Sequence, residues 1–159
     1  MLVGVISDTH SLLRAEAMAA LHGVDLILHA GDVGTWTVLR ELGTIAPVHA
    51  VYGNTNGPEL GLPASLSLTL DSARVHVSHG HELGSPTPAK LVARYHADVI
   101  IYGHTHKPLI ETHGQTLVLN PGAAGPRRFS LKPSVALLTI EGGRASALLV
   151  ELGDRIRET

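Results

Sequence analysis

The chain has 159 residues and a 44% hydrophobic content, which suit one globular domain with a sizeable core. It contains no cysteine, which excludes a disulfide framework, a thiol nucleophile and a cysteine-rich zinc site. The formal net charge is -2 and aromatic residues make up only 3%, so the sequence lacks the basic surface expected for binding duplex nucleic acid and the stacking platforms expected for single strands.

The first third of the sequence predicts alternating strands and helices. An apolar strand over residues 2–7 precedes a helical pattern over 12–22, a strand over 26–29, a helix over 35–42 and a strand over 48–51. This order predicts a parallel sheet. The first strand is not preceded by a signal-like segment and no apolar run reaches membrane-spanning length, so we expect a soluble, cytoplasmic protein.

The middle of the sequence changes character. Residues 65–70 and 74–78 alternate with period two on either side of a turn, which predicts an antiparallel hairpin. A helix over 88–96, with Thr87 as its N-cap, leads to a buried strand over 99–102.

Four further strands complete the chain, over residues 109–111, 117–120, 135–140 and 145–151, with a hairpin at Gly142-Gly143. Two mixed β-sheets packed face to face with helices outside would bury all of these strands. We therefore predict an α/β fold, a four-layer α/β/β/α sandwich, as one domain over residues 1–159 with a charged tail at 153–159.

Side chains that can bind metals follow the predicted strands in six short segments. These are Asp8-Thr9-His10, Gly31-Asp32, Gly53-Asn54, His79-Gly80-His81, Gly103-His104-Thr105-His106 and, as a companion, Asn120-Pro121-Gly122. Side chains just past the ends of several strands can converge at one edge of an open sheet, where α/β enzymes place their chemistry. The segments together predict a dinuclear metal hydrolase.

Each segment alone has an ordinary explanation, since Asp8 or Asp32 could cap a helix and a single histidine could lie on the surface. His104 and His106 are more specific, because two imidazoles so close must stay neutral together, which a bound metal explains. The remaining histidines lack such a partner and are expected to be structural or exposed: His22, His49, His76, His96 and His113.

The donor set comprises two carboxylates, four imidazoles and one amide, which offers too few oxygens for calcium. Manganese, iron, zinc, nickel or magnesium fit it. Two such ions about 3.5–4 Å apart can clamp a phosphate and hold a hydroxide for in-line attack. The predicted chemistry is therefore hydrolysis of a small phosphoester.

In this order the motifs resemble those of the calcineurin-like metallophosphoesterases, and more narrowly their small bacterial and archaeal phosphodiesterase branch. The resemblance extends over residues 1–152 and includes Asn120-Pro121-Gly122 followed by Pro126-Arg127. It implies the metallophosphoesterase fold, hydrolysis of phosphodiesters, and two divalent metal ions with manganese as the usual choice.

The resemblance also implies a role for each motif residue. One metal would be held by Asp8, His10, Asp32 and His106. The second would be held by Asp32, Asn54, His79 and His104, so that Asp32 bridges the two. The catalytic set would then be Asp32, Asn54, His79 and His81, with Asn54, His81 and Arg127 as candidates for substrate contact. Arg128 is expected to form a surface salt bridge.

Thr55 and Asn56 depart from the pattern of the family. Larger members place a histidine directly after the motif asparagine, and small members commonly have Gly-Asn-Cys-Asp, whereas this sequence has Gly53-Asn54-Thr55-Asn56. Threonine is a poor general acid at neutral pH, and Asn56 removes a negative charge. We therefore expect a preference for good leaving groups.

Two alternatives stay open. One is a non-catalytic scaffold on the same fold that binds partner proteins, like the retromer subunit that resembles this family with an altered metal site. The other is a metal-dependent nuclease acting on short or single-stranded substrate, because charges scattered in sequence can gather in space. The sequence does not decide whether the chain self-associates.

Overall fold

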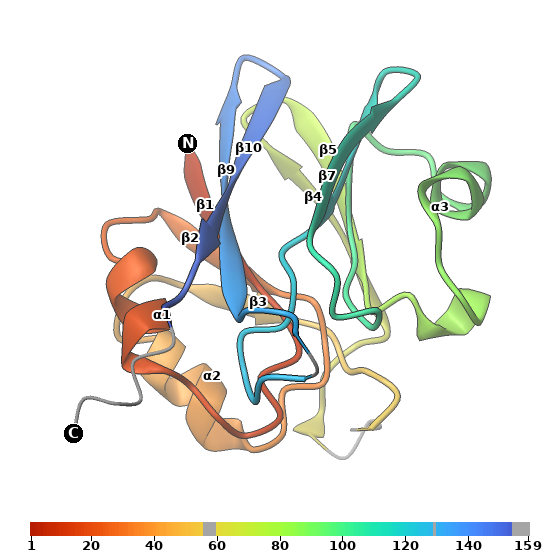
Figure 1. The fold of residues 1–159 in the computed structure, drawn as a ribbon. Coiled ribbons are helices and arrows are strands. Elements are labelled where there is room, and N and C mark those ends of the chain that lie inside the picture. Colours follow the sequence, from red (N-terminus) through yellow and green to blue (C-terminus); the bar gives the residue numbers. More distant parts are fainter. Residues whose placement is uncertain (56–59, 129, 154–159) are drawn as a thin grey trace.

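Two five-stranded sheets form the centre of the molecule in a computed structural model, which describes residues 1–55, 60–128 and 130–153 (Figure 1). The strands are β1 (Leu2–Ile6), β2 (Leu26–His29), β3 (Val48–Ala50), β4 (Ser65–Leu70), β5 (Ala73–Ser78), β6 (Val99–Ile101), β7 (Leu109–His113), β8 (Thr116–Asn120), β9 (Ser134–Glu141) and β10 (Arg144–Glu151). The helices are α1 (Ala15–Ala20), α2 (Trp36–Leu42), α3 (Pro88–Arg94) and the short 3-10 turn η2 (His81–Leu83). Asn56 and residues 154–159 of the predicted tail lie outside the described residues.

Both sheets are mixed. The first has the order β10-β9-β1-β2-β3, in which β1, β2 and β3 are parallel and β9 and β10 are antiparallel to their neighbours. The second has the order β4-β5-β6-β8-β7, with β5, β6 and β8 parallel and an antiparallel strand at each edge. The parallel β1-β2-β3 unit and the β4–β5 hairpin are as predicted.

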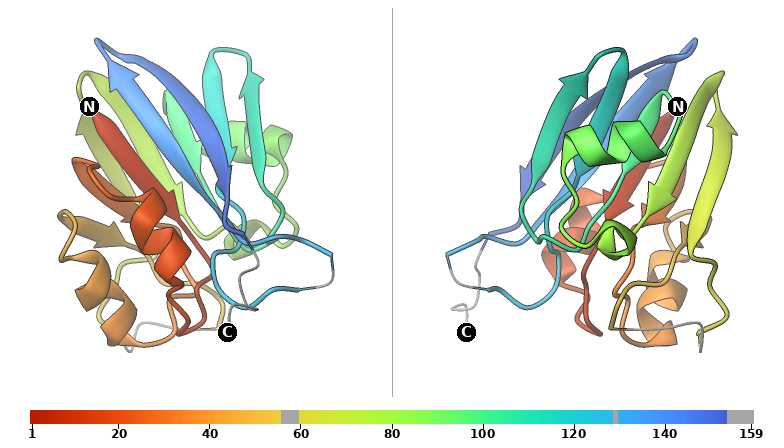
Figure 2. Two further views of the ribbon diagram at one scale, coloured as in Figure 1. Left: turned by 60° about the vertical axis from the view of Figure 1, so that its left-hand side comes forward. Right: turned by 90° about the vertical axis from the view of Figure 1, so that its right-hand side faces the viewer.

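The layers follow from which side chains each strand buries. Alternate residues such as Val5, Leu28 and Val75 fill the space between the sheets. The opposite face of the first sheet packs under α1 and α2 through residues such as Leu21 and Ile27. A smaller cluster joins α3 to the second sheet. The two views of Figure 2 show α1 and α2 on one outer side and α3 on the other, which confirms the four-layer α/β/β/α prediction.

Two helices are shorter than predicted. α1 begins at Ala15 rather than at residue 12, because His10 and Ser11 have φ values of 45° and 72° and a turn bonds Leu12 N–H to the Thr9 carbonyl. α3 ends at Arg94, since Tyr95 is extended. Its predicted N-cap is confirmed, with Lys90 N–H donating to Thr87 Oγ1 at 3.2 Å.

Among the helices of the described residues, none has the length and apolar character needed to cross a membrane.

Candidate metal centre

The metal-binding motifs of the sequence meet at one edge of the molecule, past the carboxyl ends of five strands. Asp8 and His10 follow β1, Asp32 follows β2 and Asn54 follows β3, all in the first sheet. The second sheet contributes His79 and His81 after β5, and His104 and His106 after β6. The cluster therefore spans the seam between the two sheets.

The backbone of the motif loops is unusual. Five of the residues predicted to bind metal lie in the left-handed region, with φ values between 45° and 69°: Asp8, His10, Asp32, His104 and His106. Non-glycine residues seldom adopt this conformation, although Asp and His tolerate it better than most, and such strain collects at functional sites.

Glycines let these loops approach one another. A Cβ atom on Gly53 would overlap the Asp32 carboxylate, and one on Gly103 would overlap Ser7 Oγ and lie 2.7 Å from Asp8 Oδ2. The glycine that precedes Asn54 and the one that precedes His104 are thus required by close contact with the two carboxylates.

Each carboxylate has one oxygen fixed by the protein and the other directed into the cluster. Asp8 Oδ2 accepts from Ser7 Oγ at 2.7 Å and from His104 N–H at 3.2 Å. Asp32 Oδ1 accepts from Thr55 N–H at 3.0 Å. The other oxygens, Asp8 Oδ1 and Asp32 Oδ2, face imidazole nitrogens.

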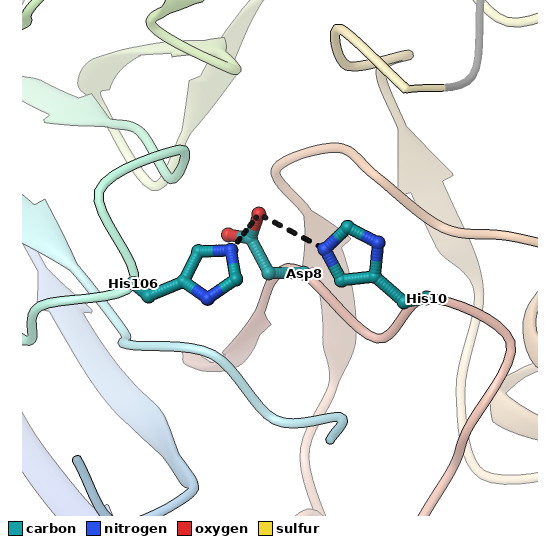
Figure 3. A group of neighbouring side chains, drawn as sticks. All are labelled: Asp8, His10 and His106. Atoms are coloured by element: carbon teal, nitrogen blue, oxygen red, sulfur yellow. Dashed lines mark ion pairs between the residues drawn. The ribbon is translucent and has the colours of Figure 1, made fainter. Parts of the chain in front are cut away.

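Imidazole nitrogens surround these two oxygens. His106 Nε2 lies 3.3 Å and His10 Nε2 lies 3.9 Å from Asp8 Oδ1, with the carboxylate between the two rings (Figure 3). His79 Nε2 is 3.3 Å from Asp32 Oδ2 and 3.8 Å from Asp8 Oδ1. Two groups with the spacing of metal ligands result, one of Asp8, His10 and His106 and one of Asp8, Asp32 and His79.

Asp8 belongs to both groups, and Asp32 also contacts both. The Oδ2 atom of Asp32 is 3.7 Å from His10 Nε2 in the first group and 3.3 Å from His79 Nε2 in the second. Asn54 joins the second group, because its Oδ1 lies 3.0 Å from His79 Nε2 and 3.2 Å from His104 Nδ1. The seven predicted ligands are thus brought together.

His79 is held in one orientation. Its Nδ1 donates to the Ala30 carbonyl at 2.8 Å, so Nε2 points at the carboxylates. Backbone carbonyls commonly orient metal-binding histidines in this way. Burial lowers the pKa of His79, but the hydrogen bond to Asp32 and the charge of Asp8 raise it more, so that it ends above its usual value. The ring thus carries a proton more readily than a free histidine.

The neighbouring groups keep the charge of the centre negative. Burial raises the pKa values of Asp8 and Asp32, but His106 acting on Asp8, and His79 with Thr55 acting on Asp32, outweigh it and leave both carboxyl groups below their usual range. Burial lowers the pKa values of His10 and His104. The two carboxylates therefore stay charged while His10 and His104 favour the neutral form, an arrangement that attracts a cation.

The buried atoms without partners fit a metal. Asp8 Oδ1 and His10 Nε2 are both buried and have no hydrogen-bond partner among the described residues, although they face each other. Buried polar atoms left unsatisfied are costly, and a bound ion is one way to satisfy them. The donors are nitrogen and oxygen only, which suits divalent transition metals or magnesium.

His81 lies beside the cluster, and its ring centroid is 5.4 Å from that of His79 and 6.3 Å from that of His104. Its Nδ1 is buried without a hydrogen bond, 3.9 Å from Glu82 Oε1. Arg127 is exposed. Arg128 makes no ion pair with another described residue and instead lines a cavity of about 150 Å³ together with His104 and His106.

Asn120 supports the centre from behind. Its side chain is buried, donates to Gly103 O and Thr105 Oγ1 at 3.1 Å each, and accepts from Gly122 N–H at 2.9 Å. The sequence grouped it with the metal-binding segments. In the structure, the Asn120 amide instead forms hydrogen bonds that hold the loop carrying His104 and His106.

His29 is a supporting residue that the sequence did not reveal. It is fully buried, and its Nδ1 accepts from Gly31 N–H at 3.1 Å. Its Nε2–H must then donate to Thr9 Oγ1, 3.0 Å away, while that hydroxyl donates to Val33 O at 2.7 Å. Burial lowers the pKa of His29 to about 4, so the ring stays neutral. Its only signal in the sequence is a histidine ending an apolar strand.

The other histidines lie away from the cluster. His22, His49, His96 and His113 are exposed. His76 is buried, bonds to Ser78 Oγ at 3.1 Å and stacks on Tyr95 with 3.7 Å between ring centroids.

Comparison with known proteins identifies similar sequences. A family model described as the calcineurin-like phosphoesterase superfamily domain matches residues 1–143. A probable metallophosphoesterase from Methanothermobacter thermautotrophicus is 38% identical, with 96% of this chain and 94% of the relative covered. A phosphodiesterase from Methanocaldococcus jannaschii is 31% identical over 77% of this chain and 83% of its own length.

A solved structure shares the architecture. Vps29 from Entamoeba histolytica superimposes with a TM-score of 0.78 at 25% identity, covering 96% of this chain and 100% of that one. The same fold occurs in a Cryptosporidium parvum protein named Vacuolar Protein Sorting 29, with a TM-score of 0.79 at 22% identity over 96% of this chain and 98% of that one.

Proposed function

The chain belongs to the calcineurin-like phosphoesterase superfamily, and from that premise we propose that it is a dinuclear metal-dependent phosphodiesterase acting on small phosphoesters. The observation that carries the proposal is the pair of ligand groups sharing Asp8, with Asp32 spanning both. We assign one metal to Asp8, His10, Asp32 and His106, and the other to Asp32, Asn54, His79 and His104. Manganese is the metal we would test first.

Divalent cations bound there would polarise a phosphoryl oxygen and lower the pKa of a bound water. Hydrogen bonds from the protein hold one oxygen of each carboxylate, those of Asp8 and Asp32, and leave the other oxygen directed into the site. Ala30 holds His79 with Nε2 toward the same point. We assign His81, whose ring lies beside those of His79 and His104, to substrate contact. In hydrolysis, the water oxygen forms a bond to phosphorus and a water proton passes to solvent. The bond to the leaving oxygen breaks with its electron pair on that oxygen, and the resulting alkoxide or phenoxide takes its proton from solvent.

The environment of Asn54 leads us to expect a strong dependence on the leaving group. The next residue, Thr55, donates its backbone N–H to Asp32, and its hydroxyl is a poor acid. Bis(p-nitrophenyl) phosphate should therefore turn over at least about a hundredfold faster than a simple dialkyl phosphate, the range that a missing general acid accounts for. Steady-state kinetics on both diesters checks this.

A Thr55→His variant is the matched test, since it restores an acid after Asn54. The variant should lower the ratio of aryl to alkyl hydrolysis rates, because it should speed hydrolysis of the alkyl diester more than that of the aryl diester. Similar rates for the two diesters with wild-type protein would show that the leaving group is protonated by another residue.

A non-catalytic scaffold is the second candidate, and the likeness to Vps29 is the observation that favours it. The ligand groups argue against it, because a surface used only for protein contact has no need of buried, unpartnered Asp8 and His10 atoms. A protein that binds metal but hydrolyses no phosphoester would favour the scaffold.

A further inference from the structure

The outer face of the β4–β5 hairpin is left uncovered by the helices. α3 packs over β6 and β8, where Leu91 contacts Ile100 and Val118. Beside it are two adjoining cavities, of about 480 and 370 Å³, which share the lining residues Ser67, His76, Arg94 and Tyr95. We refer to the two cavities together as the β4–β5 groove.

One end of the groove reaches the metal centre. Tyr52 and His81 line the larger cavity, with 6.5 Å between their ring centroids. His81 in turn lies against His79 and His104. A diester whose phosphorus sits at the centre can therefore extend one arm past His81 into the groove.

The groove presents hydrogen-bond donors. The hydroxyls of Tyr52, Ser65 and Ser67 bond to no other described residue, and each lines the larger cavity. Arg94 forms no ion pair within the described part of the chain, and its Cζ lies 5.1 Å from the centre of the Tyr95 ring. A cation–π contact of this kind restrains a guanidinium while its N–H groups stay available.

The carboxylate of the groove is already engaged. Glu82 Oε1 accepts from Gly80 N–H at 2.9 Å and Oε2 accepts from Tyr95 Oη–H at 2.7 Å. Among the described residues that line the two cavities, Glu82 is the one acidic side chain. Two guanidinium groups, those of Arg74 and Arg94, line the groove against this one carboxylate. With the spare donors, they make an anionic arm rich in acceptors the complement of the groove.

We propose that the β4–β5 groove binds the retained arm of a phosphodiester that carries a second phosphate, as a nucleoside bisphosphate does, with Arg94 contacting that phosphate. This inference rests on the proposed phosphodiesterase function. The groove is larger than the cavity of about 150 Å³ beside His104, so we assign the retained arm to the groove and the leaving arm to that cavity.

Two chromogenic esters that differ only in the second phosphate test the groove. They are thymidine 5′-(p-nitrophenyl phosphate) and the same ester phosphorylated on its 3′ oxygen. Wild-type protein should show a KM about threefold to fivefold lower for the phosphorylated ester, the gain expected from one solvent-exposed charge pair. Arg94→Gln should abolish that preference and leave the rate on bis(p-nitrophenyl) phosphate unchanged.

Two further variants sharpen the result. Arg40→Gln removes a similar charge from α2, on the opposite sheet, and should preserve the preference. Ser67→Asp places a negative charge in the groove from an exposed strand position and should reverse it. Equal KM values for the two esters in wild-type protein, or a preference that survives Arg94→Gln, would overturn the proposal.

Failure of the phosphodiesterase function would look different. In that case bis(p-nitrophenyl) phosphate is not hydrolysed with any added metal. Calorimetric binding of thymidine 3′,5′-bisphosphate then tests the groove proposal independently of catalysis. We expect weaker binding to Arg94→Gln than to wild type, and equal binding would contradict the inference.

Discussion

Replacing Asp32 by asparagine is expected to lower kcat/KM for bis(p-nitrophenyl) phosphate about a thousandfold. The two side chains have nearly the same shape, so the variant removes a charge without leaving a cavity. Asp32 Oδ2 faces His10 and His79 in the two ligand groups, and loss of its charge weakens both. A metal centre contributes several kcal/mol to transition-state stabilisation, and each 1.4 kcal/mol corresponds to about a tenfold change in rate.

The measurement pairs kinetics with metal content after dialysis. Asp25→Asn is the control, because Asp25 is exposed, and its Oδ2 accepts from Leu2 N–H far from the centre. We expect wild-type kinetics for the control and reduced metal content for Asp32→Asn. Activity of Asp32→Asn within tenfold of wild type would remove Asp32 from the proposed bridging position.

Replacing His29 by leucine is expected to lower the free energy of unfolding by about 2 to 3 kcal/mol, the cost of leaving one buried donor and one buried acceptor without partners. The variant removes the acceptor of Gly31 N–H and the donor to Thr9 Oγ1. The Thr9 bond joins the loop after β1 to the end of β2, and the Gly31 bond fixes the start of the loop after β2, so metal affinity should fall as well. Urea unfolding of the metal-free protein measures the change in the free energy of unfolding apart from any change in metal affinity.

The control for this change is His49→Leu, on the neighbouring strand β3. His49 pairs with Leu28 in the sheet but is exposed, so its loss should change stability by less than about 0.5 kcal/mol. If both variants unfold at the same urea concentration as wild type, the His29 network does not hold the two loops together.

The sequence predicted the strand ends and their ligands because both depend on local patterns. An apolar run predicts a buried strand, and the residues that stop it, such as Gly31-Asp32 or Gly103-His104, mark where that strand ends. Both signals lie within a few neighbouring residues. The hairpin at Asp71-Ser72 was equally local, and both residues have positive φ as a tight hairpin turn requires.

What the sequence did not reveal depends on contacts between distant segments. His29 becomes structural only when Thr9 and Gly31 fold around it. Arg128, which was expected in a surface salt bridge, instead lines the cavity beside His104, a contact between segments distant in the sequence. Asn120 has a side chain that could bind a metal, yet both ends of its amide form hydrogen bonds with the backbone of neighbouring loops.

Hydrolysis of bis(p-nitrophenyl) phosphate by metal-stripped protein, with manganese, nickel, zinc or magnesium added back, tests the central proposal most directly. We expect no turnover in the stripped protein, restoration by at least one metal that saturates at two ions per chain, and no restoration in a His79→Ala variant. Stoichiometric metal binding without turnover for every metal would contradict the phosphodiesterase function and favour the scaffold.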